Sequence, residues 1–221
     1  MAGIEAILFD AYGTLFDLRS AVTPHAPRLG DRSDRVLAVW RQKQLEYTWT
    51  ATLRDAYRPF DVITRAALDF ALAAERIVDP TLADSLMSSF SSLEPYSDAE
   101  PSLRALAARG PRLGILSNGT PAMLARLLER PAFGGLLQPV LSVDSVKAFK
   151  PDARVYQSGT EALGLPRDRI GFVSSNAWDA AGAAGFGFRT FWINRAQQPV
   201  EYGLGDCAAM FPDLAALAKA I

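Results

Sequence analysis

Short apolar runs alternate with helical stretches through the second half of the chain, from about residue 101 to its C-terminal end. Strands are predicted at 112–116, 140–143, 170–173 and 188–193, and helices at 103–109, 121–129, 152–163, 178–184 and 213–220. Strands that are separated by helices of this length pair in parallel, with the helices packed against the sheet. The alternation therefore predicts an α/β fold in which helices cover both faces of a parallel sheet.

The first strand of this sheet lies near the N-terminus. Ile7, Leu8 and Phe9 form an apolar run that is too short for a helix and is typical of a strand buried on both faces. The run ends at Asp10. Most aspartates at strand ends only cap a loop, but the carboxyl end of a central strand is also where open α/β sheets bind their ligands. Asp10 is therefore a candidate site residue.

The chain changes character between residues 17 and 95. Strand signals disappear, and helical periodicity takes over at 33–56, 61–77 and 81–90. Pro95 and Pro101 then mark the return to alternating helices and strands. We predict a core domain of residues 1–16 plus 96–221 and an inserted, all-helical cap domain of residues 17–95.

Composition excludes several classes of function. The chain has 221 residues and a net charge of −1, so it carries no excess of positive charge for nucleic acid or an anionic membrane. Cys207 is the only cysteine, which excludes an internal disulfide and a cysteine metal cluster. His25 is the only histidine, which argues against a zinc site and against a Ser-His-Asp triad unless His25 serves it.

Localisation follows from the apolar segments. No apolar run approaches the length of a transmembrane helix. Glu5 and Asp10 interrupt any apolar region of a signal peptide. We expect a cytoplasmic protein.

Polar segments follow the strands at the positions where a parallel sheet gathers its ligands. These segments are 10–14, Ser117-Asn118-Gly119, Lys150-Pro151-Asp152 and 174–179. A hydroxyl beside free backbone N–H groups at a helix N-terminus forms a good anion cradle. Each segment alone is a common turn or helix cap. Four of them in this order indicate a single site at one edge of the sheet.

The segments resemble those of the haloacid dehalogenase (HAD) superfamily and, within it, the L-2-haloacid dehalogenases, also called type II 2-haloacid dehalogenases. The most discriminating are Asp-Ala-Tyr-Gly-Thr-Leu at 10–15, Trp-Arg-Gln-Lys-Gln-Leu-Glu-Tyr at 40–47 and Ser-Ser-Asn-Ala-Trp-Asp at 174–179. The resemblance covers essentially the whole chain. It implies a HAD-like fold, in which a Rossmann-like parallel-sheet core carries an inserted helical cap.

The resemblance implies a covalent mechanism. Asp10 would attack C2 of a 2-haloacid and expel halide, leaving an ester between Asp10 and the substrate. Lys150 would hold Asp10 in its ionised form, because a neighbouring positive charge favours the carboxylate. Asp179, with Ser174 and Asn176, would position or deprotonate the water that hydrolyses the ester. Asp179 is equally suited to pair with Lys150 for stability alone.

The leaving halide needs a cationic partner, and Arg41 is the candidate. Leu37, Arg41 and Leu45 lie one turn apart on one helical face. An arginine between leucines is either a surface residue with its stem over apolar neighbours or a cation that receives an anion. The dehalogenase-like context favours the second reading. The resemblance implies further substrate or halide contacts by Asn118, Phe60, Tyr12, Gln42, Leu45, Trp178, Ser117, Ala11 and Thr14.

Phosphatases of the same superfamily provide the alternative. They use a second aspartate two residues after the nucleophile as a general acid, and an acidic cluster that holds Mg²⁺. This chain has Tyr12 at the first position, whose ordinary pKa near 10 makes it a poor acid at neutral pH. At the cluster it has serines and an asparagine before Asp179. Asp10 and Asp179 are then the only carboxylates there, a poor set of ligands for Mg²⁺, so we expect no metal and no other cofactor. A halide leaving group needs no proton, so a dehalogenase loses nothing by lacking the acid.

Three hypotheses therefore remain. The first is a hydrolase acting on carbon–halide bonds, an (S)-2-haloacid dehalogenase that converts short L-2-haloalkanoic acids to D-2-hydroxy acids with inversion at C2. The others are a Mg²⁺-dependent phosphatase and a catalytically silent binding protein on the same scaffold. The expected partner is a small 2-haloacid, and family habit suggests a homodimer. One departure is Asp61, where the subgroup carries an aromatic, so this position is expected to change the shape of the pocket.

Overall fold

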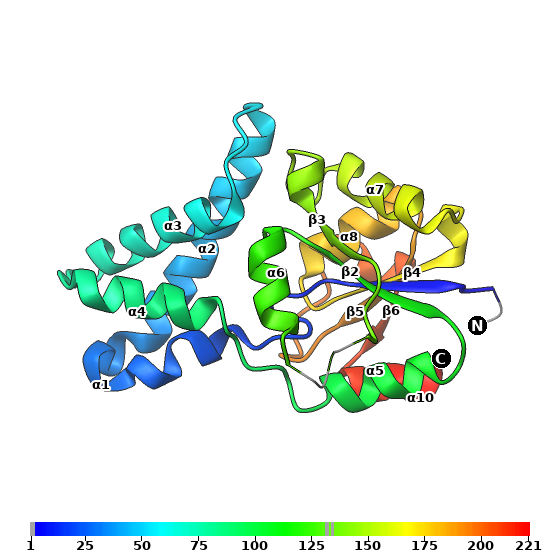
Figure 1. Cartoon of the computed structure of the whole chain (residues 1–221), viewed down its shortest axis with the longest axis horizontal. Helices are drawn as coiled ribbons and strands as arrows, with labels where there is room; N and C mark the ends of the chain where they lie inside the picture. Colours follow the sequence, from blue (N-terminus) through cyan, green and yellow to red (C-terminus); the bar gives the residue numbers. More distant parts are fainter. Residues whose placement is uncertain (1–2, 131–132, 134) are drawn as a thin grey trace.

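The computed structural model describes residues 3–130, 133 and 135–221, and the strands in this part of the chain form one parallel sheet (Figure 1). The sheet order is β3-β2-β1-β4-β5-β6. The strands are β1 (Ala6–Phe9), β2 (Arg112–Ser117), β3 (Val140–Ser142), β4 (Ile170–Ser174), β5 (Arg189–Ile193) and β6 (Ala208–Phe211). The predicted α/β fold with a parallel sheet is confirmed.

β1 is a central strand, as its unbroken apolar run predicts. It pairs in parallel with β2 on one side and with β4 on the other, and all four of its residues are buried. The chain adds β2 and β3 on one side of β1 before it returns to build β4, β5 and β6 on the other. Such a reversal of strand order opens a crevice at the carboxyl ends of the two strands that flank it, here β1 and β4.

Helices cover both faces of the sheet. α5 (Ala99–Ala107) and α10 (Leu214–Ala220) lie on one face, and α7 (Ala153–Leu163) and α8 (Ala177–Phe186) lie on the other (Figure 1). α6 (Pro121–Leu128) follows β2, and the short α9 (Leu204–Cys207) precedes β6. α5 begins four residues before its predicted start, because Pro101 falls in its first turn, where no N–H needs an intrahelical partner.

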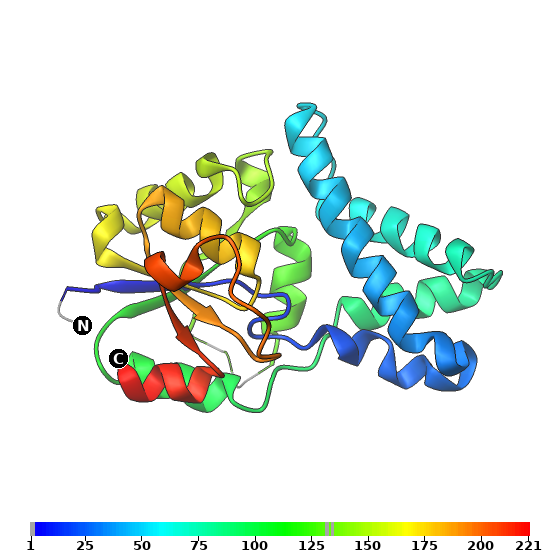
Figure 2. The ribbon, with the colours of Figure 1, turned by 180° about the vertical axis from the view of Figure 1, so that it is seen from behind.

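The helices between β1 and α5 lie beside the sheet and cover neither of its faces (Figures 1 and 2). They are α1 (Ala26–Leu29), α2 (Ser33–Leu53), α3 (Phe60–Ala74) and α4 (Pro80–Phe90), with short 3-10 turns before and after α1. We call this group the cap. α2 ends three residues before its predicted end, because Asp55 adopts a left-handed backbone conformation with φ of 51°.

The two connections between the cap and the sheet run side by side. The N–H of Asp17 donates to the carbonyl of Glu94 at 2.8 Å, and the N–H of Tyr96 donates to the carbonyl of Leu15 at 2.9 Å. These bonds lie next to the predicted boundaries at residues 16/17 and 95/96. The division into two domains at those positions stays a prediction.

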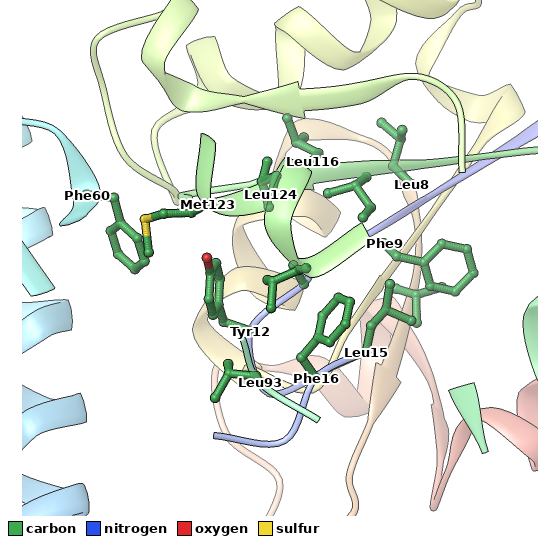
Figure 3. Close-up of a cluster of buried hydrophobic side chains, with 14 of the residues drawn as sticks. Leu8, Phe9, Tyr12, Leu15, Phe16, Phe60, Leu93, Leu116, Met123 and Leu124 are labelled. Atoms are coloured by element: carbon green, nitrogen blue, oxygen red, sulfur yellow. The ribbon is translucent and has the colours of Figure 1, made fainter. Parts of the chain in front are cut away.

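Apolar packing continues from the sheet into the cap (Figure 3). The ring of Tyr12, in the turn after β1, stacks on Phe90 of α4 at 5.2 Å between centroids and lies 5.5 Å from Phe60 of α3. Burying one large apolar side chain stabilises a fold by roughly 1.5–3 kcal/mol. These rings therefore hold the cap against the sheet beside the turn that carries Asp10. None of the described helices is both long enough and apolar enough to span a membrane.

Candidate active site

The predicted site residues at strand ends do meet at one edge of the sheet. Asp10 follows β1, Ser117 ends β2 and Ser174 ends β4. The register places Phe9 opposite Ile115 and Val173, so the three strands end side by side. The N–H of Asp10 also donates to the carbonyl of Val173 at 2.9 Å, which extends the β1–β4 ladder to the carboxylate itself.

The turn after β1 fixes the Asp10 carboxylate. Gly13 has φ of +85°, a conformation that glycine adopts without a steric penalty. The N–H groups of Leu15 and Phe16 both donate to the carbonyl of Ala11 at 3.0 Å. The turn brings the Thr14 hydroxyl back to Asp10, where it donates to Oδ2 at 3.1 Å. Asp10 is 5% exposed, so its carboxylate is held in a largely dry position.

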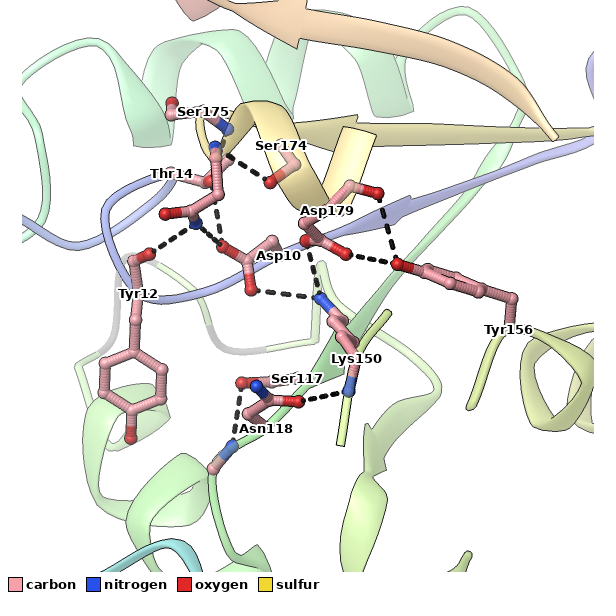
Figure 4. A network of polar contacts seen from close by, with 12 residues as sticks. Asp10, Tyr12, Thr14, Ser117, Asn118, Lys150, Tyr156, Ser174, Ser175 and Asp179 are labelled. Atoms are coloured by element: carbon pink, nitrogen blue, oxygen red, sulfur yellow. Dashed lines mark hydrogen bonds and ion pairs between the residues drawn. The ribbon is translucent and has the colours of Figure 1, made fainter. Parts of the chain in front are cut away.

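Lys150 lies between two carboxylates (Figure 4). Its Nζ is 3.1 Å from Oδ1 of Asp10 and 3.0 Å from Oδ2 of Asp179. The lysine and Asp179 are fully buried. Asn118 positions the lysine backbone, because its Oδ1 accepts a hydrogen bond from the Lys150 N–H at 3.1 Å. A buried cation shared by two carboxylates offsets the repulsion between them.

Asp179 is more basic than an ordinary aspartate. Burial raises the pKa of Asp179 to about 6, and the charge of Asp10 adds to this effect while Lys150 opposes it. A carboxylate with such a pKa is ionised at neutral pH and can accept a proton from water. Asp179 is thus able both to pair with Lys150 and to act as a base.

Tyr156 joins this group and was not predicted. Its hydroxyl donates to Oδ1 of Asp179 at 2.8 Å, opposite the oxygen that contacts Lys150 (Figure 4). Burial and the charge of Asp179 raise the pKa of Tyr156 well above its ordinary value, so the phenol stays a neutral donor. Tyr156 lies inside α7, where a buried aromatic residue is indistinguishable in sequence from ordinary core.

Asn176 connects Asp10 to the cap. Its Nδ2 donates to Oδ2 of Asp10 at 2.8 Å and to the carbonyl of Tyr12 at 3.2 Å, and its Oδ1 accepts from Nη2 of Arg41 at 3.1 Å. The backbone N–H of Asn176 donates to the Ser174 hydroxyl at 3.1 Å. Arg41 therefore faces the core site from α2, and the reading of it as a plain surface residue does not fit this contact.

The guanidinium of Arg41 interacts electrostatically with the carboxylates of Asp10 and Asp179. Burial lowers the pKa of Arg41, whereas the charges of Asp10 and Asp179 raise it. Guanidinium groups keep their proton in proteins, so Arg41 is a partly buried cation at the end of the site opposite Lys150. Such a cation in a poorly solvated position is suited to receive an anion.

The other predicted residues differ in how deeply they are buried. Ala11, Tyr12, Phe60 and Ser117 are buried at the site, and Asn118 is 7% exposed. Leu45 and Trp178 are half-buried, whereas Gln42 is exposed on α2. The buried amide of this helix is instead Gln44, which accepts from Nη1 of Arg41 at 2.7 Å and was not predicted.

Asp61, where the chain departs from the resemblance, lies on the outer side of α3, and its effect on the shape of the pocket stays a prediction. It is exposed and lines a surface depression with Val62, Arg65 and Asp69. Phe60, the preceding residue, points inward to Tyr12. Consecutive helical residues face directions about 100° apart, so the inward position of Phe60 turns Asp61 outward.

Comparison with known proteins agrees with this geometry. A family model described as haloacid dehalogenase-like hydrolase matches residues 4–187. The chain belongs to the haloacid dehalogenase-like hydrolases. It is 44% identical over 203 residues to (S)-2-haloacid dehalogenase 1 of Pseudomonas sp. strain CBS-3, covering 91% of this chain and 89% of that protein. It is 44% identical over 200 residues to (S)-2-haloacid dehalogenase 4A of Burkholderia cepacia, covering 90% and 87%.

A solved relative extends the likeness to three dimensions. The L-2-haloacid dehalogenase of Xanthobacter autotrophicus with chloropropionic acid covalently bound is 32% identical, with a TM-score of 0.86 over 98% of this chain and 97% of that one. The predicted resemblance to the L-2-haloacid dehalogenases and the predicted HAD-like fold are confirmed. The hydrolase class predicted from the sequence is confirmed with them.

The chemistry available to this haloacid dehalogenase-like hydrolase differs from that of a phosphatase. Burial and the charge of Asp10 raise the pKa of Tyr12 above its ordinary value, so this hydroxyl is a poorer acid than a free phenol. Among the described residues, no group of three or more His, Cys, Asp and Glu side chains is arranged to hold a metal ion. What the hydrolase does place together is the Asp10 carboxylate, the cations of Lys150 and Arg41, and the Asp179 carboxylate with its raised pKa.

Proposed function

We propose that this hydrolase converts short L-2-haloalkanoic acids to D-2-hydroxy acids through an aspartyl-ester intermediate, with inversion at C2. The observation that carries the proposal is the position of the Asp10 carboxylate, held by Lys150 on one side and by Asn176 and then Arg41 on the other. The (S)-2-haloacid dehalogenases at 44% identity, and the relative with chloropropionic acid covalently bound, support the same chemistry.

In the first step an oxygen of Asp10 attacks C2 from the side opposite the halogen. The carbon–oxygen bond forms as the carbon–halogen bond breaks, and the halide leaves with its electron pair. Arg41 receives the halide, with Asn118 and Phe60 as the expected neighbours. Placing a cation where negative charge develops stabilises the transition state more than the ground state. The step needs no proton, which agrees with a tyrosine rather than an acid at position 12.

The substrate carboxylate requires donors of its own. The Ser117 hydroxyl accepts from the N–H of Gly119 at 3.1 Å, a contact that does not use the hydroxyl hydrogen. The N–H groups from Gly13 to Phe16 donate within the turn. The N–H groups of Ala11 and Tyr12 are therefore the candidate backbone donors, beside the hydroxyl of Ser117.

In the second step water attacks the aspartyl carbonyl carbon. Asp179 takes a proton from the water, and Lys150 stabilises the negative charge that develops on the carbonyl oxygen. Collapse of the intermediate breaks the bond between the carbonyl carbon and the ester oxygen. The leaving oxygen takes the proton that Asp179 had accepted, so the hydroxy acid departs with its hydroxyl complete. Asp10 then releases the remaining proton of the water to solvent and regains its carboxylate. Ser174 and Asn176 help to position the water.

The phosphatase alternative is less well supported. Tyr12 stands where a general acid would be needed, and its ring packs against Phe60 and Phe90. A catalytically silent binding protein would not need a buried lysine between a strand-end carboxylate and a basic carboxylate.

Cytoplasmic localisation and a homodimer belong to the same proposal. The first rests on the apolar segments of the sequence, and the second on the resemblance. Cell fractionation and sedimentation of the purified protein would test them, and a monomer at micromolar concentration would remove the dimer.

Halide release from racemic 2-chloropropionate is expected to be unchanged by EDTA, because Lys150 and Arg41 supply the positive charge that the reaction needs. Release should stop at about half of the racemate if only the L enantiomer reacts. The measurement is chloride release with and without EDTA, beside a p-nitrophenyl phosphate assay with Mg²⁺. Phosphate turnover without halide release would move the protein to the phosphatase class.

A single turnover in H₂¹⁸O, with enzyme in excess, is expected to give a 2-hydroxy acid that carries unlabelled oxygen. The new hydroxyl oxygen comes from Asp10 in the ester route, and the oxygen of water stays in the Asp10 carboxylate. Mass spectrometry of the product and of the peptide containing Asp10 measures both. Labelled product from that first turnover would contradict the ester and leave Asp10 as a general base.

Replacing Arg41 by lysine is expected to lower kcat/KM by about 100-fold or more, because a point charge cannot reproduce the planar fork that contacts Asn176 and the halide. Arg35→Lys is the matched control, since Arg35 lies on the same helix in an exposed pair with Glu75. A folded Arg41→Lys variant with unchanged kcat/KM would show that Arg41 does not receive the halide.

A further inference from the structure

The hydrogen bonds described for Arg41 go to neutral acceptors. Nη1 donates to Oε1 of Gln44 at 2.7 Å, and Nη2 donates to Oδ1 of Asn176 at 3.1 Å. Among the described residues no carboxylate lies within ion-pair distance of this guanidinium, although the charge of Asp10 is felt from further away. The two amide oxygens fix the orientation of the guanidinium but do not neutralise its positive charge, which can still pair with an anion.

Gln44 can present only its oxygen to Arg41. The hydroxyl of Thr64 donates to the backbone carbonyl of Phe60 at 2.6 Å, so toward Gln44 it acts as an acceptor. The Gln44 Nε2 fills that role and donates to the Thr64 Oγ1 at 2.7 Å. The amide is therefore fixed at both ends, and its remaining group, Oε1, faces Arg41.

This chain of hydrogen bonds is buried and joins two helices of the cap. Gln44 is 1% exposed on α2, and Thr64 is fully buried on α3. It ends at Phe60, whose ring lies beside Tyr12 at the site. A buried, fully satisfied polar chain holds its members in one geometry, because leaving any of them unpaired carries a desolvation penalty.

We propose that Gln44, held by Thr64, is a positioning residue that fixes the Arg41 guanidinium without neutralising it, so that its full charge meets the departing halide. The inference rests on the proposed dehalogenase function and extends it to a residue pair inside the cap. It also accounts for an amide at position 44. A glutamate of the same shape would hold Arg41 equally well, but it would satisfy the charge before the halide arrives.

Two substitutions at Gln44 separate orientation from charge. Gln44→Met removes the acceptor and keeps the bulk, and kcat/KM for 2-chloropropionate is expected to fall about 10- to 100-fold, the usual effect of losing a hydrogen bond to a charged group. Gln44→Glu keeps the acceptor and neutralises Arg41, and its loss is expected to be at least as large. If Gln44 served only packing, Gln44→Glu could impair folding, but the variant that did fold would catalyse the reaction at the wild-type rate.

Thr64 provides a matched pair. Thr64→Val keeps the shape and removes the hydroxyl that anchors Gln44, whereas Thr64→Ser keeps the hydroxyl. We expect Thr64→Val to lower kcat/KM about 10-fold and Thr64→Ser to stay near the wild type. Because these two variants change no charge, they remain informative if Gln44→Glu fails to fold. Thermal unfolding of each variant is measured beside activity.

The dependence of kcat/KM on the leaving halide distinguishes the proposed role from a purely structural one. A purely structural role would leave this dependence unchanged. Bromide leaves more readily than chloride and needs less help from Arg41, so the ratio of kcat/KM for 2-bromopropionate over 2-chloropropionate should rise in Gln44→Met, Gln44→Glu and Thr64→Val. Product inhibition by bromide should weaken in the same variants. Folded variants with the wild-type ratio and the wild-type inhibition constant would overturn the proposal. A wild-type enzyme that releases neither halide would instead contradict the proposed function.

Discussion

Replacing Asp10 by asparagine is expected to abolish halide release, with a loss in kcat on the order of 10³ or more. An amide nitrogen or oxygen at this position cannot displace halide from C2, yet the substitution keeps the size of the side chain. Thr14 and Asn176 still surround it, and Lys150 keeps Asp179 as a partner, so the fold should persist.

The measurement is halide release together with the mass of the peptide that contains residue 10. Wild-type enzyme quenched during turnover should show the mass of the substrate ester on this peptide, and Asp10→Asn should not. Asp31→Asn, in an exposed turn of the cap, is the control and should behave like the wild type. Asp10→Asn activity within tenfold of the wild type would refute Asp10 as the nucleophile.

Replacing Lys150 by methionine is expected to reduce both activity and stability. Lys150 is buried between Asp10 and Asp179, so its loss leaves two neighbouring carboxylates without a cation. Breaking a buried pair in this way costs about 3 kcal/mol or more of unfolding free energy. Halide release should fall about 100-fold or more, because the carbonyl oxygen of the ester also loses its cation.

The stability loss of Lys150→Met should depend on pH in a defined direction. Burial already raises the pKa of Asp179 to about 6, and removal of Lys150 raises it further. A carboxyl whose folded-state pKa lies above its unfolded value stabilises the fold at low pH, and this contribution is lost as pH rises through the folded pKa. The variant should therefore be closer to the wild type at pH 5 than at pH 8.

Urea unfolding of both proteins at the two pH values measures this effect. Lys219→Met, an exposed substitution in α10, is the control. A Lys150→Met variant with wild-type stability at pH 8 would show that Lys150 does not compensate the two carboxylates.

The sequence was most informative where chemistry sits at the end of a strand. In a parallel sheet all strands end at the same edge, so an acid after β1, a hydroxyl at the end of β2 and a serine at the end of β4 must meet. Lys150 could be placed near them because it lies in the segment just before α7, which begins at Ala153. The same reasoning predicted the parallel sheet, because alternation of strand and helix admits few other arrangements.

Residues inside helices could not be predicted in the same way. Tyr156 and Gln44 each lie within a helix, where a buried side chain has the same sequence signature whether it packs or hydrogen-bonds to a functional group. The partner of Gln44 is in another helix of the cap, and the partner of Tyr156 is on α8. β6 was also missed, since this four-residue edge strand is partly accessible and begins with two alanines, a residue type that is depleted in strands.

The polar groups of the site form a row in which the sign of charge alternates: Asp179, Lys150, Asp10 and, beyond Asn176, Arg41. In the proposed reaction, ester formation removes the negative charge from Asp10 and creates one on the halide beside Arg41. The total charge of the enclosed site is then the same before and after the displacement. One unit has only moved along the row, so the surrounding dipoles need little reorientation as the reaction proceeds. With Asp10 neutral, burial still raises the pKa of Asp179, but the smaller contribution from the charge of Asp10 is gone, and Lys150 pairs with Asp179 alone while water attacks.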